Sequence, residues 1–444
     1  MNKDLTVGKP EKVLVKFTLP LFISVIFQQL YNIADSVIAG KYAGENALAA
    51  VGASYPITMI FMAVAIGSQI GCSVVISRFF GAKDYKNTKI CISTTLIAGF
   101  VLSIFLVLTG ILFSSPLMRI INTPDNIFAD GNLYLRIYTS GFVFLYIYNI
   151  TTGIFNSLGD SKTPLYFLIV SSIGNIALDA LFVIVFKWGV AGVAWATFIA
   201  QGIACVFSVI ILRRRVLKIP SEEKIKRLSI NALKNISKVA VPSILQQSFV
   251  SVGNMFIQCF VNGFGSSVIA GYSAAIKLNT FAVTSFVTLG NGISSFTAQN
   301  LGAKKPERIR KGFRSGLVFA LIVALVFFGV FFVCGKALLM LFMNEESTKL
   351  AIDTGVNFLK IVSPFYFAVC TKLVCDGVLR GSEKMTYFMT STFTDLVLRV
   401  VFAYAFSRLW AQAGIWYAWP ISWIIAAILS CVFYKRTIYT KSNF

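Results

Sequence analysis

The sequence of 444 residues contains no histidine, and its eight cysteines form no Cys-x-x-Cys pair. The lack of histidine excludes histidine metal sites, Ser–His catalytic sets and histidine proton relays. Cysteines in apolar segments, such as Cys72, Cys205, Cys259 and Cys370, are typical of small core residues rather than of metal ligands or disulfides. No P-loop sequence is present either, so ATP hydrolysis is not expected. We therefore predict no enzymatic activity and no cofactor.

Charged residues are also scarce. Only 13% of the residues are charged, 57% are hydrophobic, and the mean hydropathy is +0.77. The apolar residues come in runs of about 20, which is the length that crosses a bilayer core as a helix. Backbone in lipid must satisfy its own hydrogen bonds, and a β-barrel would instead show short alternating segments. The composition predicts an all-α integral membrane protein.

We predict twelve transmembrane helices in this chain. Their expected ranges are Val15–Ala39, Ala47–Ser77, Ile90–Phe113, Leu133–Leu158, Leu165–Phe186, Val190–Leu212, Val239–Val261, Val268–Phe296, Phe313–Phe342, Val356–Val378, Met385–Phe406 and Ile415–Tyr434. The first span is too long for a signal-peptide core and has no small-residue cleavage site, so we expect it to remain in the protein.

The charges that are present are unevenly placed. The chain has 40 Lys and Arg against 18 Asp and Glu, a net charge of +22. Most of the basic residues lie in loops on the side of the N-terminus, including Arg78–Lys89, Arg213–Lys238 and Lys304–Arg314. This is the positive-inside pattern, which predicts cytoplasmic termini in a plasma or inner membrane. It favours contact with lipid headgroups over nucleic-acid binding.

The two halves of the sequence resemble each other. A shift of about 221 residues, with small slips, aligns Pro20 with Pro242, Arg78–Lys83 with Gln299–Lys304, Leu158-Gly159 with Arg380-Gly381, and Gly192 with Gly414. Each half holds six spans, so the halves have the same orientation, as in transporters built from parallel repeats around a central cavity. We expect an N-terminal bundle at 1–212, a basic cytoplasmic linker at 213–238 and a C-terminal bundle at 239–444. A receptor or assembly protein without transport is the alternative from another class.

Several loop and helix motifs carry a family resemblance. They are Pro20, the stretch Gln29-Leu-x-Asn32-x-x-Asp35 followed by Gly40, the two Gly-Ala-Lys loops ending at Lys83 and Lys304, Leu158-Gly159-Asp160-x-Lys162-Thr-Pro164, and Leu379-Arg380-Gly381. With the twelve spans and the repeat, the chain resembles the multidrug and toxic compound extrusion (MATE) transporters over essentially its whole length. The resemblance implies an antiporter that exports bulky, often cationic amphiphiles in exchange for sodium ions or protons. A lipid-linked oligosaccharide flippase of the same superfamily is the nearest alternative.

Ionisable residues within the spans are functional candidates, because charge at membrane depth is costly. The acids are Asp35, Asp179, Asp376 and Asp395, and the bases are Lys277, Lys372 and Arg399. Lys372 with Asp376, and Asp395 with Arg399, are spaced four residues apart and can pair on one helix. We expect these pairs to be structural. Lys277 has no such partner and its role stays open.

Asp35 and Asp179 have no basic residue within a helical turn or two. Asn175 lies one turn before Asp179 on the same face. At about 1.5 Å per residue, Asp35 lies about 28 Å from the cytoplasmic start of its span, and Asp179 and Thr197 lie about 22 Å from theirs. Such an oxygen-only group suits sodium, and two crowded carboxylates also favour proton binding.

The resemblance implies the same site. One MATE branch binds its coupling cation through an Asp on the first helix, an Asn and an Asp on the fifth and a Thr on the sixth, which match Asp35, Asn175, Asp179 and Thr197. The C-terminal cation site of another branch is doubtful here, because Ser243–Val261 contains no acid.

The substrate cavity is expected to be lined by aromatic and amide side chains with few fixed hydrogen bonds. The candidates are Gln28, Tyr31, Tyr146, Gln246, Gln247 and Tyr366. Cation binding would let the first helix repack, since Pro20 and Gly40 bracket it with weak points. The expected partners are small amphiphilic molecules and the bilayer, and the duplicated halves can form the whole pathway in a monomer.

Overall fold

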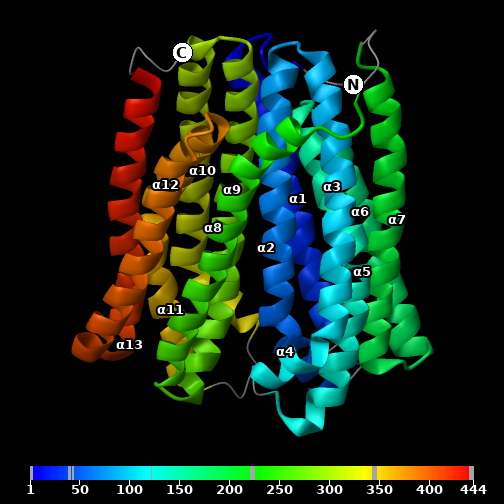
Figure 1. The fold of residues 1–444 in the computed structure, drawn as a ribbon. Coiled ribbons are helices and arrows are strands. Elements are labelled where there is room, and N and C mark those ends of the chain that lie inside the picture. Colours follow the sequence, from blue (N-terminus) through cyan, green and yellow to red (C-terminus); the bar gives the residue numbers. More distant parts are fainter. Residues whose placement is uncertain are drawn as a thin grey trace. The chain divides into compact units, whose positions relative to one another are not determined.

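The computed structural model describes residues 4–38, 42, 45–121, 123–220, 226–342 and 348–439. Over these residues the chain is helical, with no β-strand (Figure 1). The helices are α1 (Pro10–Ile38), α2 (Glu45–Gly81), α3 (Tyr85–Leu112), α4 (Ser114–Ile120), α5 (Asp125–Ser157), α6 (Lys162–Asp179), η2 (Ala180–Val185), α7 (Gly189–Leu217), α8 (Ile230–Asn262), α9 (Ser266–Gly302), α10 (Pro306–Met340), α11 (Lys349–Val362), η3 (Ser363–Phe365), α12 (Tyr366–Gly381) and α13 (Met385–Tyr439). Gly40 lies outside the described residues.

The prediction of twelve spanning helices is confirmed. α6 continues into η2 as one rod, α11 continues through η3 into α12 as another, and α13 contains two rods that meet at a break. Among the described residues, nine helical segments are long and apolar enough to cross a membrane, and one of them, Met385–Ile438, contains both rods of α13. The helices extend beyond the apolar runs; α8, for example, begins at Ile230 rather than at Val239. Adding a turn to an existing helix costs little, so it continues into the charged flanks.

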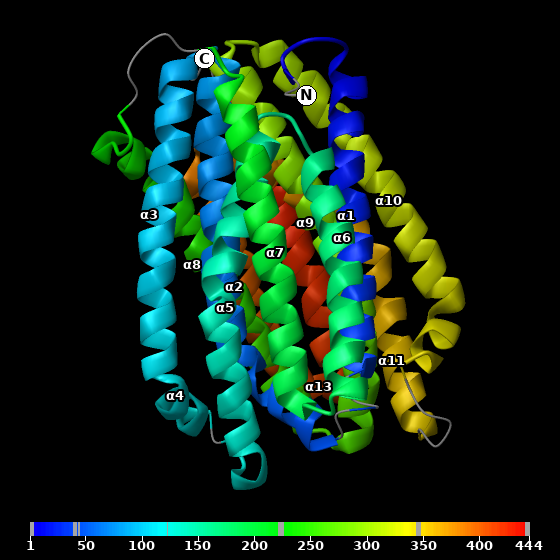
Figure 2. The same ribbon diagram turned by 90° about the vertical axis from the view of Figure 1, so that its right-hand side faces the viewer.

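The helix α4 was not predicted. It follows α3 directly and lies across the end of α3 and α5 (Figure 2). Pro116 falls in its first turn, where a proline needs no N–H partner. The side chain of Met118 is fully buried.

By packing, the described chain divides into two compact units, comprising Asp4 with Ile23–Ser248 and Leu5–Phe22 with Phe249–Tyr439. We call them unit 1 and unit 2. The division falls within α1 and α8, whereas the repeat places a boundary in the basic linker 213–238. The two divisions differ because a long continuous helix can contribute its two ends to different packed groups.

In unit 1, α5 packs against α2, α3 and α7, and α6 packs against α7. The first part of α8 lies very close to α2. A Cβ atom added at Gly71 would lie 2.4 Å from Cβ of Ala240, and one added at Gly67 would lie 2.4 Å from the side chain of Ile244. Glycine therefore permits this helix contact.

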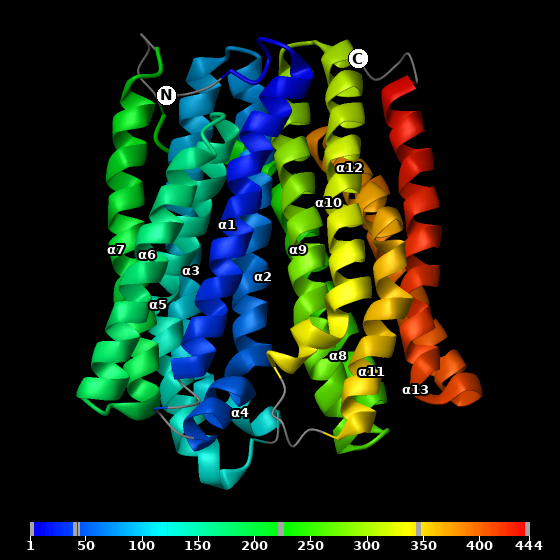
Figure 3. The same cartoon turned by 180° about the vertical axis from the view of Figure 1, so that it is seen from behind.

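In unit 2, α9 packs against α10, α11 and α12 (Figure 3). The N-terminal segment also belongs to this unit. Leu5 donates its N–H to Oε1 of Gln299 at 2.9 Å, and Arg308 Nη2 donates to the Leu5 carbonyl at 3.1 Å. Lys305 Nζ donates to the Thr6 carbonyl at 2.9 Å.

The internal repeat is visible in the backbone. Lys83 and Lys304, which end the two Gly-Ala-Lys loops, have φ values of 58° and 56°. Gly189, after Trp188, has φ 56°, and Ala411, after Trp410, has φ 49°. A left-handed conformation is rare for alanine, and it breaks α13 at the point where α6/η2 gives way to α7 in unit 1.

Candidate functional site

The two acids without basic neighbours come together in unit 1. Asp35 lies in the last turn of α1 and Asp179 is the last residue of α6. Their carboxyl groups lie within hydrogen-bonding reach of each other. Asp179 is fully buried, yet neither of its carboxyl oxygens has a hydrogen-bond partner, and Asp35 Oδ1 is also buried without one. Two buried carboxyl groups that face each other are stable only if a cation or a proton reduces their charge.

Asn175 adds a third polar group on α6. It is 2% exposed, and neither its Oδ1 nor its Nδ2 has a hydrogen-bond partner. Leaving such a group unsatisfied costs about 1–3 kcal/mol, so unsatisfied buried groups in a native protein call for an explanation. Here they lie on the same helix as Asp179 and one turn away from it. The arrangement gives a set of oxygen acceptors that is available to a ligand.

The backbone changes at this position. Asp179 is followed at once by the π-helical turn η2, whose wider winding interrupts the regular α-helical pattern. Such insertions are rare and frequently occur at functional sites. The apolar sequence of η2 carries no glycine or proline, so no local signal predicts it.

Tyr31 and Thr197 also belong to this group. The Tyr31 hydroxyl lies within hydrogen-bonding reach of the Thr197 side chain, and its phenol is electrostatically coupled to Asp35 and Asp179. Tyr31 was predicted as a wall of the substrate cavity, whereas the structure places it beside the acids. The structure thus brings Thr197, Asp35 and Asp179 together as expected, while their role in coupling stays a prediction.

Two residues of the site were not predicted. Tyr134 and Tyr138 reach it from α5, with stacked rings whose centroids lie 6.2 Å apart. Tyr134 is electrostatically coupled to Tyr31, Asp35 and Asp179. Their spacing of four residues puts both tyrosines on one helix face, and this signal could have found them.

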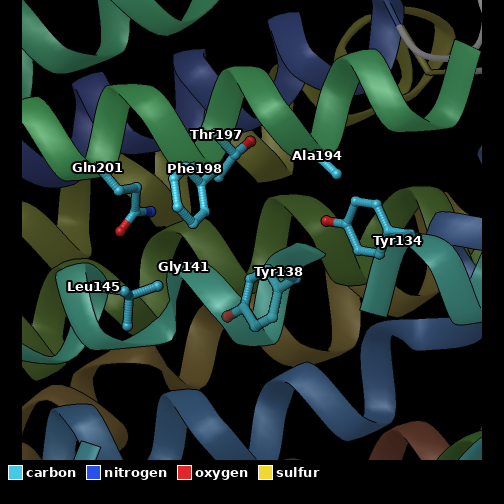
Figure 4. A pocket seen from close by; sticks show the side chains of 8 residues that line it. All are labelled: Tyr134, Tyr138, Gly141, Leu145, Ala194, Thr197, Phe198 and Gln201. Carbon is cyan, nitrogen blue, oxygen red and sulfur yellow. The ribbon is translucent and has the colours of Figure 1, made fainter. Parts of the chain in front are cut away.

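A small pocket lies beside these tyrosines, between α5 and α7. Its lining residues are Tyr134, Tyr138, Gly141, Leu145, Ala194, Thr197, Phe198 and Gln201. In Figure 4 the two phenol rings come from α5, and the Thr197 hydroxyl comes from α7. An aromatic pocket next to paired acids has the chemistry that recognises organic cations.

The remaining cavity candidates are placed differently. Gln28 is exposed, and Gln246 and Gln247 are partly exposed. Tyr146 is 2% exposed and donates to Oγ of Ser68 at 2.8 Å, and Tyr366 is fully buried and donates to Oδ1 of Asn279 at 3.1 Å. Tyr146 and Tyr366 therefore act as core residues of their units in this conformation, which gives no support to their predicted place in a cavity wall.

The predicted charge pairs of unit 2 are confirmed. Lys372 Nζ lies 2.7 Å from Oδ2 of Asp376, and Arg399 Nη2 lies 2.9 Å from Oδ1 of Asp395. All four side chains are buried. Lys277 is exposed, and its Nζ lies 5.7 Å from the ring centroid of Phe342. In the part of the chain that the structure describes, no three His, Cys, Asp or Glu side chains form a metal-binding cluster.

Known proteins resemble this chain over nearly its full length. The family model MatE matches residues 20–181 and 242–405. "Probable multidrug resistance protein YpnP" of Bacillus subtilis (strain 168) is 28% identical, covering 97% of this chain and 96% of its own. "Multidrug export protein MepA" of Staphylococcus saprophyticus is 23% identical over 76% of this chain and 74% of its own. "FAD transporter" of Shewanella oneidensis is 25% identical over 70% of each chain.

Solved structures show the same fold. An outward-facing conformation of a multidrug resistance MATE family transporter of the MOP superfamily matches with a TM-score of 0.93 and 23% identity, over 99% of this chain and 98% of that one. A MOP superfamily transporter from Pyrococcus furiosus matches with a TM-score of 0.92 and 23% identity, over 98% and 97%. At this identity the likeness concerns the fold alone.

Proposed function

The chain belongs to the MatE family, and on this premise we propose that it is a secondary active antiporter that exports amphiphilic, often cationic compounds in exchange for sodium ions or protons. Two of the similar proteins are described as multidrug resistance or export proteins, which supports this substrate class. The observation that carries the coupling is the pair of buried acids, Asp35 and Asp179, whose oxygens lack protein partners.

The coupling cation binds at Asp35, Asn175, Asp179 and Thr197. Carboxylate, amide and hydroxyl oxygens are hard donors, which suits sodium better than a soft transition metal. A proton shared between the two carboxyl groups would neutralise the same site. The unsatisfied oxygens of Asp179 and Asn175 fit either ion.

Cation binding is coupled to transport through α1. Pro20 lies inside α1, and the helix contributes its first part to unit 2 and its last part, with Tyr31 and Asp35, to unit 1. Neutralising Asp35 and Asp179 removes their repulsion and changes the conformation that the end of α1 prefers. Cation and substrate then stabilise competing conformations, and this difference in affinity is what coupling requires.

The substrate meets unit 1 at the tyrosine pocket. The faces of Tyr134 and Tyr138 attract the cationic part of an amphiphile, and Phe198 and Leu145 offer apolar contact. Few fixed hydrogen bonds line this wall, so it tolerates different substrates. The protein works as a monomer in the plasma or inner membrane, with both termini in the cytoplasm.

Efflux from proteoliposomes tests this function. A fluorescent organic cation is loaded, and a sodium gradient or a proton gradient is imposed for wild type, Asp35→Asn and the control Asp130→Asn, which changes an exposed acid. We expect one gradient to drive efflux in wild type and the control and not in Asp35→Asn. Absence of efflux under both gradients would favour a flippase, to be tested with lipid-linked oligosaccharides.

A further inference from the structure

The repeat can be followed from the cation site of unit 1 into unit 2. A shift of 222 residues places Trp188 and Gly189 on Trp410 and Ala411, and the second residue of each pair has a positive φ. The rod α6/η2 and the helix α7 therefore correspond to the first and second rods of α13. Each residue of the candidate site on these elements has a definable counterpart.

The carboxylates of the site have apolar counterparts. The same shift pairs Pro20 with Pro242 and places Asp35 on Ile257, which is fully buried in the core of unit 2. It places Asp179 on Val401, whose side chain is 52% exposed. Unit 2 thus lacks both acids at the corresponding positions.

The pocket wall of unit 1 is replaced by tryptophans in unit 2. The pocket residues Ala194, Thr197 and Gln201 of α7 correspond to Trp416, Trp419 and Trp423. The three indoles are 1%, 4% and 1% exposed. The ring of Phe358 packs edge-on against Trp416 and Trp419, with centroid distances of 5.2 and 6.0 Å. Large side chains therefore fill the space that is a pocket in unit 1.

A guanidinium group lies among these tryptophans. Cζ of Arg399 lies 4.4 Å from the ring centroid of Trp419 and 6.0 Å from that of Trp423. Nη2 of Arg399 donates to both carboxyl oxygens of Asp395 at 2.9 Å. Arg399 and Asp395 are only 7% and 5% exposed. A carboxylate combined with aromatic faces is an arrangement that binds planar organic cations.

We propose that Arg399 is a tethered cation, which fills a guanidinium-binding cage of Asp395, Trp419 and Trp423 at the counterpart of the exchangeable cation site. Because a covalently attached guanidinium cannot leave, unit 2 exchanges no cation during transport. Each chain then has one exchangeable cation site, the site at Asp35 and Asp179. This stoichiometry rests on the proposed coupling in unit 1, whereas the cage rests on the contacts of Arg399 alone.

The test removes the tethered cation and supplies a free one. In an Asp35→Asn background, which disables the site in unit 1, Arg399→Ala should create a site for guanidinium. Radiolabelled guanidinium at millimolar concentration should bind once per chain to detergent-purified Asp35→Asn/Arg399→Ala and raise its melting temperature. Asp35→Asn alone should not respond, and adding Asp395→Asn should weaken binding at least tenfold. Urea, a neutral molecule of similar shape, should have no such effect.

The result that overturns the proposal is an equal response to guanidinium with and without Arg399. If the Arg399→Ala protein does not fold by itself, membranes are solubilised with guanidinium or with urea. Recovery of monodisperse protein with guanidinium only would support the cage, and no recovery with either would overturn it. Arg399→Lys, which keeps the charge but loses the planar face, should bind no free guanidinium. None of these readouts measures transport, so their failure would leave the antiport proposal standing.

Discussion

Replacing Asp179 by asparagine tests the cation site through the stability of the protein. Two unit charges about 4 Å apart at an effective dielectric constant of about 20 interact by about 4 kcal/mol. Asp179 is fully buried and its carboxyl group faces that of Asp35, so Asp179→Asn removes a repulsion of about this size from the ion-free protein. It also removes a similar attraction for a bound cation, which weakens binding by about three orders of magnitude.

The assay is the melting temperature of purified protein as the coupling ion is titrated at constant ionic strength. An ion at about 100 times its Kd stabilises the folded state by about 2.7 kcal/mol, and an ion bound about a thousandfold more weakly adds almost nothing at that concentration. Wild type should therefore gain a few degrees with sodium or with protons, whereas Asp179→Asn should start higher and gain nothing. Asp130→Asn, which changes an exposed acid, should behave as wild type. An ion-dependent gain in Asp179→Asn equal to that of wild type would refute the site.

Three further predictions concern packing. Asp395→Asn leaves a buried arginine without its carboxylate and should cost about 3–5 kcal/mol of unfolding free energy, more than replacing both partners by apolar residues; chemical denaturation in detergent checks this. The sulfur atoms of Cys375 and Cys431 lie 3.7 Å apart, so copper-phenanthroline should oxidise the two thiols to a disulfide that mass spectrometry detects, and persistent free thiols would contradict the packing of α12 on α13. Gly71→Ala should destabilise by about 1–3 kcal/mol through overpacking, whereas Gly174→Ala, with no atom within 4 Å of the added Cβ, should not.

The sequence predicts the helical rods and the approximate height of the site within them. Continuous apolar runs determine the twelve spans, and a rise of about 1.5 Å per residue places Asp35, Asp179 and Thr197 at similar depth. This arithmetic succeeds because a helix has a fixed pitch. The i,i+4 spacing likewise predicts the pair of Asp395 and Arg399, since both members lie on one helix.

The orientation of each helix about its own axis is harder to predict. Depth does not tell whether an aromatic side chain faces a cavity or a neighbouring helix, so Tyr146 and Tyr366 were expected in a cavity wall and are buried in the cores of their units. Tyr134 and Tyr138 reach the site through the packing of α5 against α7, which depends on all the contacts between these helices. The π-helical turn after Asp179 results from packing too, and its apolar sequence would also suit a regular helix.

Coupled flux is the measurement that tests the central claim most directly. Proteoliposomes containing wild type or Asp35→Asn receive a saturating pulse of an organic cation, while the movement of sodium ions and of protons is recorded in the same vesicles. The account predicts that the pulse drives one of these ions in the opposite direction in wild type, and that Asp35→Asn abolishes this ion movement. Equal ion movement in both proteins, or substrate movement without any counter-ion, would contradict antiport through the acid pair.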